Sequence, residues 1–81
     1  MTEVLQRFEC IVDEVTPKSV CVRLYDLTNM DNPIEVAEMP IEQFDDNMKK
    51  ELVNGFVFYW YIGYDKKING QIVKASEFSY G

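Results

Sequence analysis

Alternating apolar and polar positions predict two strands in the first third of the chain. Segments 7–15 (RFECIVDEV) and 19–27 (SVCVRLYDL) both carry apolar residues at every second position, which is typical of half-buried strands. Thr16 and Pro17 lie between them in a sequence that favours a turn. The two segments therefore predict a hairpin with a three-residue loop. The register that follows places Cys10 opposite Leu24 and Val12 opposite Val22.

Segment 34–41 (IEVAEMPI) predicts a third strand at an edge of the sheet. Pro40 lacks the N–H that an interior strand must donate, so this strand should end near it or pair on one side only. Glu35 and Glu38 would discourage this edge from pairing with other chains.

Segment 42–55 changes its period and predicts a short helix of about two turns. Either Asp45 or Asp46 can cap its N-terminus, and Asn54 with Gly55 favours its end. Apolar residues recur every four positions, so we expect Met48 and Leu52 to cover one end of the sheet.

Segment 55–64 (GFVFYWYIGY) is uncharged and strongly aromatic, which favours a fourth and central strand. Segment 71–80 predicts a fifth strand, joined to it by a loop with Asn69 and Gly70. Because side chains alternate, Tyr59 and Tyr61 should face outward. The residues expected to fill the interior are Phe56, Phe58, Trp60 and Ile62.

Five short strands and one helix predict a mainly β domain spanning residues 1–81. A small barrel buries a common interior economically in a chain of this length. The element order resembles the OB-fold, and an SH3-like barrel is the alternative. The run from VRLYDLT to GFVFYWYIGY also resembles short bacterial proteins with no assigned activity, and this resemblance implies a fold rather than a function.

The net charge of −6 is unevenly distributed along the chain. Residues 29–54 carry seven acids against two bases, whereas residues 55–81 carry two acids against three bases. An acidic chain opposes general binding to phosphate backbones and favours a basic partner surface. No segment has the length of a signal peptide core or a membrane-spanning helix, so we expect a cytoplasmic protein without membrane contact.

The sequence predicts no catalytic, cofactor or metal site. Histidine is absent, and no phosphate-binding glycine motif is present. Cys10 and Cys21 should face opposite sides of the hairpin, so we expect two free thiols. Oxygen ligands in loop 26–33 permit calcium binding, but a loop that only turns the chain is the simpler interpretation.

These patterns favour a non-enzymatic protein-interaction module, either self-associating or binding a basic protein. Such a module could inhibit or regulate a protein that binds nucleic acid. The alternative is an OB-like binder of single-stranded nucleic acid that stacks bases on tyrosine and tryptophan, which the acidic charge disfavours. The candidate partner-binding residues are Tyr59, Tyr61, Tyr25, Lys74, Glu35 and Glu38.

Overall fold

A single five-stranded antiparallel sheet makes up most of the fold, which the computed structural model describes over residues 3–80. The strand order is β3-β2-β1-β4-β5, so β3 and β5 are the two edges. The mainly β class, with a short helix between the third and fourth strands, is confirmed. The bounds are β1 Glu3–Val15, β2 Ser19–Asp26, β3 Glu35–Pro40, the 3₁₀ turn η1 Ile41–Gln43, α1 Asp46–Lys49, β4 Val57–Lys66 and β5 Ile72–Ser79.

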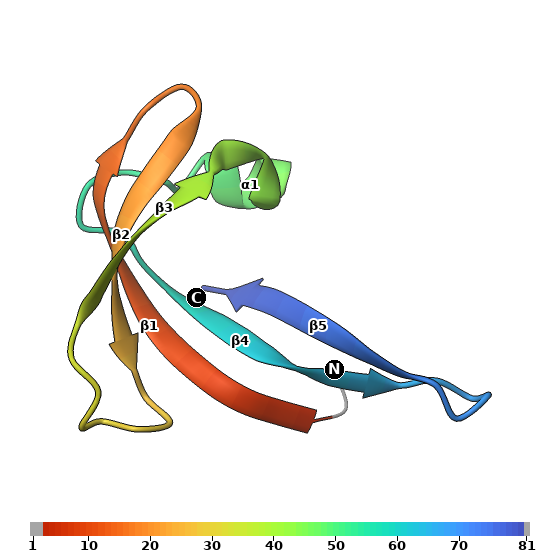
Figure 1. Cartoon of the computed structure of the whole chain (residues 1–81). Helices are drawn as coiled ribbons and strands as arrows, with labels where there is room; N and C mark the ends of the chain where they lie inside the picture. The colour runs from red at the N-terminus through yellow and green to blue at the C-terminus, as the bar shows by residue number, and fades with distance from the viewer. Residues whose placement is uncertain (1–2, 81) are drawn as a thin grey trace.

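The sheet is curled into a half barrel that has the outline of the letter L (Figure 1). The upright of the L consists of residues 8–61, with most of β1, with β2, β3 and α1, and with the start of β4. The arm consists of residues 62–76 of the β4–β5 hairpin and residues 3–6 of β1, which pair with it. Since β3 and β5 are not neighbours in the sheet, the barrel is open between them.

Strand β1 runs through both parts of the L and bends between them. Its register shifts between Val4 and Gln6 where it pairs with β4, and between Val12 and Glu14 where it pairs with β2. Each shift inserts an extra residue, and such bulges bend a strand and increase its twist. These irregularities explain how one long strand serves two differently oriented parts of the sheet.

The predicted β1–β2 hairpin is confirmed in its register, with Cys10 opposite Leu24 and Val12 opposite Val22. Thr16 fixes the turn, because its hydroxyl oxygen accepts a hydrogen bond from the Ser19 N–H at 2.9 Å. The prediction that the third strand lies at an edge is also confirmed.

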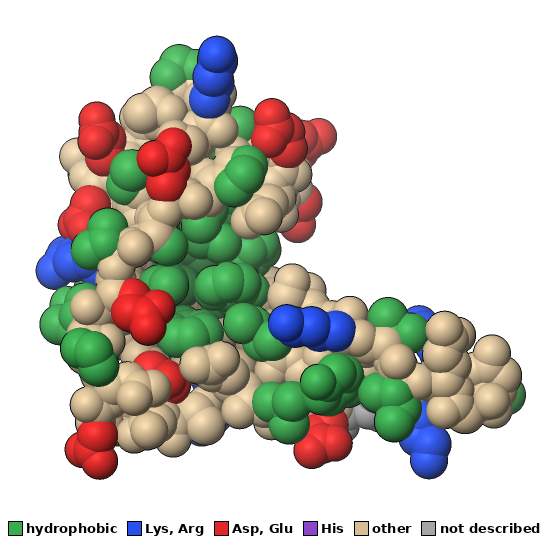
Figure 2. All heavy atoms as spheres, in the orientation of Figure 1, with side chains coloured by type: hydrophobic (Ala, Val, Ile, Leu, Met, Phe, Trp, Pro, Cys, Tyr) green, Lys and Arg blue, Asp and Glu red, His purple; other side chains and the backbone are tan. Residues whose placement is uncertain are grey.

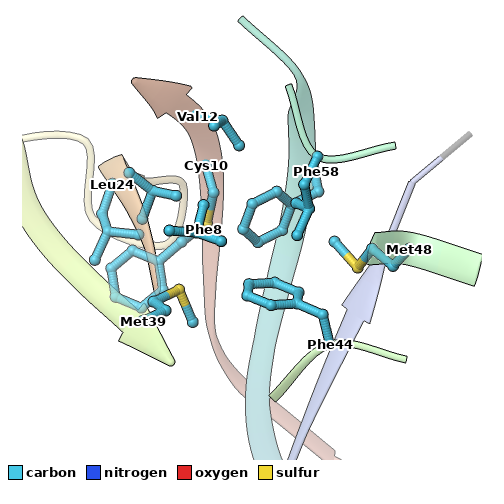
Figure 3. Packing of buried hydrophobic residues seen from close by; sticks show 11 residues of the cluster. Phe8, Cys10, Val12, Leu24, Met39, Phe44, Met48 and Phe58 are labelled. Carbon is cyan, nitrogen blue, oxygen red and sulfur yellow. The ribbon is translucent and has the colours of Figure 1, made fainter. Parts of the chain in front are cut away.

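The core lies inside the curl of the sheet, where side chains from the strands meet those of α1 (Figure 3). We call this side of the sheet the inner face and the opposite side the outer face. Phe58 is fully buried. The ring of Phe44 packs edge to face against it, with the ring centroids 5.6 Å apart. The buried hydrophobic residues are Phe8, Cys10, Val12, Val20, Val22, Leu24, Met39, Phe44, Met48, Leu52 and Phe58.

The helical segment is shorter than the sequence predicts. Instead of two continuous turns, η1 is followed by an extended Phe44 and then by the four residues of α1. Phe44 leaves the helical conformation and is buried with 2% exposure, which explains the interruption. Asp45 caps α1, since its side chain accepts a hydrogen bond from the Met48 N–H at 2.8 Å.

Strand β4 pairs on both sides, but it is not the central strand that the sequence predicts. It lies between β1 and β5, and β1 is in the middle of the sheet. β1 begins at Glu3 rather than near Arg7, and it pairs with β4 from Glu3 to Ile11 while residues 8–15 pair with β2 on its other side. The predicted inward direction of Phe56, Phe58, Trp60 and Ile62 is confirmed, because all four belong to or pack against the core.

Candidate protein-interaction surface

Three tyrosines from two strands gather on the outer face, around the central strand. Glu9 of β1 is opposite Tyr25 of β2 and Tyr59 of β4, while Arg7 is opposite Tyr61. Residues directly opposite in antiparallel strands point to the same side of a sheet, so the three rings share the outer face. We call Tyr25, Tyr59 and Tyr61 the tyrosine face, and all three side chains are half-buried.

The hydroxyl groups of two tyrosines on this face form hydrogen bonds with charged side chains. The Tyr59 hydroxyl donates a hydrogen bond to Glu9 Oε2 at 3.5 Å. Arg23 Nη1 donates to the Tyr25 hydroxyl at 3.4 Å, and Arg23 Nε donates to both carboxylate oxygens of Asp13 at 3.0 and 3.1 Å. The guanidinium group of Arg23 is therefore shared between a tyrosine and a carboxylate.

Apolar side chains extend this surface toward the β3 edge. The neighbouring row of outer-face residues crosses four strands. In the order β3, β2, β1 and β4, it consists of Val36, Arg23, Ile11 and Val57. Val36 is 76% exposed and Val57 is 39% exposed. Aromatic, aliphatic and arginine side chains together are the composition that protein interfaces favour over the rest of a surface.

One end of the outer face is negatively charged around Cys21, which lies opposite Glu14 on β1 and Glu38 on β3. Partial burial raises the pKa of the Cys21 thiol, and the carboxylates of Glu38, Glu14 and Asp13 raise this pKa further. The thiol is therefore held in its neutral form at neutral pH. A partner that approaches this end of the outer face meets several carboxylates.

Cys10 lies on the inner face, as the hairpin register predicts, and both cysteines are free. Burial in the core, and secondarily the charge of Glu9, raise the pKa of the Cys10 thiol to about 12. A thiol with so high a pKa is a weak nucleophile at neutral pH, so Cys10 serves packing.

The loop after β2 uses its oxygen atoms to fold itself. Asp26 Oδ1 accepts hydrogen bonds from the N–H groups of Thr28 and Asn29 at 2.9 and 3.0 Å. Asp26 Oδ2 accepts from the side-chain amides of Asn32 at 2.9 Å and Gln6 at 3.2 Å. The Asn29 N–H, followed by the Asn32 amide, lowers the pKa of the Asp26 carboxyl. These bonds give the carboxylate a structural role in turning the chain.

The six sequence-predicted partner residues do not form one surface. Tyr25, Tyr59 and Tyr61 share the outer face, and Glu38 lies on the same side at the β3 edge. Glu35 and Lys74 lie on the inner side of the sheet, because they are opposite Leu24 and Tyr64 respectively. The described register thus separates these two from the tyrosine face.

Two features of the site region were not predicted from the sequence. The first is Arg7 and Arg23, which accompany the tyrosines on the outer face, and strict alternation of the strands could have identified them. The second is the indole nitrogen of Trp60, which is buried and has no hydrogen-bond partner within residues 3–80. No pattern in the sequence distinguishes a paired indole N–H from an unpaired one.

Comparison with known proteins adds no relative to this description. None of the protein-family models matches the chain, and neither the curated proteins nor the solved structures contain a match. Across residues 3–80, no cluster of three or more histidine, cysteine or acidic side chains is placed to hold a metal ion. None of the helices in that range has the length and apolar character needed to cross a membrane.

Proposed function

We propose that the protein is a non-enzymatic interaction module that binds another protein through its tyrosine face. The observation that carries this proposal is the gathering of Tyr25, Tyr59 and Tyr61, with Arg7 and Arg23, on a side of the sheet opposite the core. Together with tryptophan, tyrosine and arginine are the side chains enriched among the energetic anchors of interfaces.

The charges around the tyrosine face support a protein partner with basic residues. Glu14 and Glu38 lie at one end of the outer face, and the chain as a whole carries a net charge of −6. Such a field speeds the approach of a positively charged surface and repels polyanions. If the partner is itself a protein that binds nucleic acid, the module would act as an inhibitor or regulator of that protein.

A nucleic-acid ligand fits the same surface less well. Glu9 lies between Tyr25 and Tyr59, so a strand stacked on both rings would pass over a carboxylate. Arg23 is paired with Asp13 at 3.0 Å, which reduces the positive charge that it could offer to phosphates.

The test is capture of a partner by tagged wild-type protein and by the double variant Tyr59→Ala, Tyr61→Ala. We expect a partner retained by the wild type to bind the variant more weakly by about 2 kcal/mol, which is roughly thirtyfold in Kd. Met30→Ala is the matched control, because Met30 is 76% exposed in the loop after β2, and it should bind like the wild type.

Anisotropy measurements with labelled single-stranded oligonucleotides separate the two ligand classes. Salt-sensitive oligonucleotide binding that disappears in the double variant would replace the protein partner with a nucleic acid. A partner that binds wild type and double variant equally would contradict the role of the tyrosine face.

A further inference from the structure

The chain is less compact than a typical domain of its size, and the arm leaves large apolar side chains exposed. The radius of gyration is 13.7 Å, against about 12 Å for a compact domain of 81 residues. The accessible surface is 5647 Å², against about 5,000 Å² for a typical monomer of 9.5 kDa. Large apolar side chains lie exposed along the arm, as Figure 2 illustrates. They are Val4, Leu5, Tyr64, Ile68, Ile72 and Val73.

The two edges of the sheet differ in their protection against strand addition. The β3 edge is six residues long, ends at Pro40, and carries Glu35 and Glu38. Charges and proline are the devices with which proteins keep an edge from pairing. The β5 edge is eight residues long, contains no proline, carries one charge of each sign at Lys74 and Glu77 instead of two like charges, and pairs with β4 in a register without a bulge. The edge that is open to a further strand is therefore β5.

We propose that the β5 edge pairs antiparallel with β5 of a second copy of the chain, about a twofold axis at Ala75. A twofold axis perpendicular to the sheet places the inner faces of both copies on the same side. Residues that lie opposite each other across the interface must therefore point to the same face of the sheet. Centred on Ala75, this register brings no two like charges face to face. It places Lys74 opposite Ser76, Val73 opposite Glu77 and Ile72 opposite Phe78 in the other copy.

Two of the neighbouring axis positions are less favourable. Shifting the axis to Lys74 would set two lysines directly opposite one another, and shifting it to Glu77 would do the same with two glutamates. Pairing two β3 edges would crowd four glutamates, from Glu35 and Glu38 of each copy. In the Ala75 register, by contrast, Ile72, which is 64% exposed, gains a phenylalanine neighbour.

Charge complementarity between the two halves of the molecule favours a second copy as the occupant. The tip of the arm carries Lys66 and Lys67. Antiparallel pairing directs this tip toward the end of β5 in the other copy. At that end, Phe78 stacks on Phe44 with the ring centroids 4.8 Å apart. Phe44 lies between Glu42 of η1 and Asp45, the N-cap residue of α1. A basic tip thus meets an acidic segment twice in the dimer.

A charge-reversal series tests the register by sedimentation over a range of concentrations. The wild type should reach twice the 9.5 kDa mass of the chain. Ser76→Lys sets a lysine opposite Lys74 twice per dimer, and we expect about tenfold weaker dimerisation. Adding Lys74→Glu to it should restore the dimer, since each glutamate then faces a lysine. Met30→Lys adds the same charge in an exposed loop and should leave dimerisation unchanged.

Cysteine crosslinking locates the axis independently. In a Cys21→Ser background, Ala75→Cys should form an intermolecular disulfide on air oxidation. Residues opposite each other in antiparallel strands have Cα atoms about 4.5–5.5 Å apart, which is within disulfide reach. Met30→Cys in the same background should not form one.

A monomeric wild type at millimolar concentration would overturn the proposal, as would a dimer that Ser76→Lys leaves intact. A Ser76→Cys variant that crosslinks while Ala75→Cys does not would overturn the Ala75 register. Because these variants leave the tyrosine face unchanged, failure here is separate from failure of partner binding. Equal circular dichroism spectra and melting temperatures would show that the variants are folded.

Discussion

The two halves of β1 lie in very different surroundings. From Phe8 to Val12 the strand is flanked by β2 and β4, and every second side chain is buried in the core. From Glu3 to Leu5 it pairs with β4 alone, and all three side chains are exposed. The same strand thus belongs to a packed upright and to an arm that has backbone pairing but little core. Hydrogen-bonded pairing in β1 therefore extends beyond the residues that burial in the core stabilises.

Loss of an aromatic ring from the core of the upright should destabilise the fold most. Phe58→Ala removes a fully buried phenylalanine that contacts Phe44 and Phe78. We expect it to lower the free energy of unfolding by about 3–5 kcal/mol, measured by urea denaturation. Ile72→Ala in the arm is the matched truncation, and an equal loss there would contradict the contrast between upright and arm.

The second effect concerns Asp26, at the end of β2. Its hydrogen bonds lower the pKa of the carboxyl in the folded state. Such a group stabilises the fold at pH values above its unfolded pKa of about 3.9, and this stabilisation is lost as the pH falls through the folded pKa. Asp26→Asn places an amide against the amides of Asn32 and Gln6. We therefore expect a lower free energy of unfolding at neutral pH and a smaller decrease of that free energy as the pH is lowered.

Urea midpoints measured from neutral to acid pH check this prediction. Asp31→Asn is the control, because Asp31 is exposed in the same loop. If both variants kept the acid dependence of the wild type, the Asp26 hydrogen bonds would not be its source.

A smaller effect is expected at the cap of α1. Asp45→Ala removes the acceptor for the Met48 N–H and should cost about 1 kcal/mol in unfolding free energy. Its neighbour Asp46 makes only a long ion pair with Lys49 at 3.8 Å, with the carboxylate side chain 96% exposed. Asp46→Ala should therefore change stability by less than about 0.5 kcal/mol, and the reverse ranking would show that the cap is not needed.

The smallest effect is expected at the tip of the arm. Ile68 is fully exposed, so Ile68→Ser should leave the unfolding free energy of the monomer within about 0.5 kcal/mol of the wild type. Hydrogen exchange should show faster opening of residues 64–74 than of β2, because few buried contacts hold the arm. Slow hydrogen exchange at the tip of the arm in a monomeric variant would contradict this prediction, because it would show that contacts with the upright stabilise the arm.

The sequence predicted local structure well wherever alternation and burial agree. Cys10 and Leu24 are apolar neighbours on one face, so the hairpin register followed directly from their positions. Asp45 was one of two possible caps, and both residues suit that position chemically. The directions of Tyr59 and Tyr61 followed from the same alternation, because β4 has no bulge among its aromatic residues.

The order and length of the strands were harder to predict, because they depend on contacts between distant segments. Residues 3–6 show no strong alternation, so their pairing with β4 was not foreseen. The separation of Lys74 from the tyrosine face likewise depends on which residue of β4 it opposes. Tertiary packing also overrode the helical period at Phe44, which is buried in extended conformation.

The position of β1 in the sheet has a consequence for folding on the ribosome. Its pairing with β2 is local and can form as soon as β2, which follows the turn at Thr16, has emerged. Its pairing with β4 joins Cys10 to Phe58, so it must wait until most of the chain has been synthesised. Contacts between such distant segments close large loops and form slowly. Until then one side of β1 is an unpaired strand edge, which is the kind of surface through which folding intermediates aggregate.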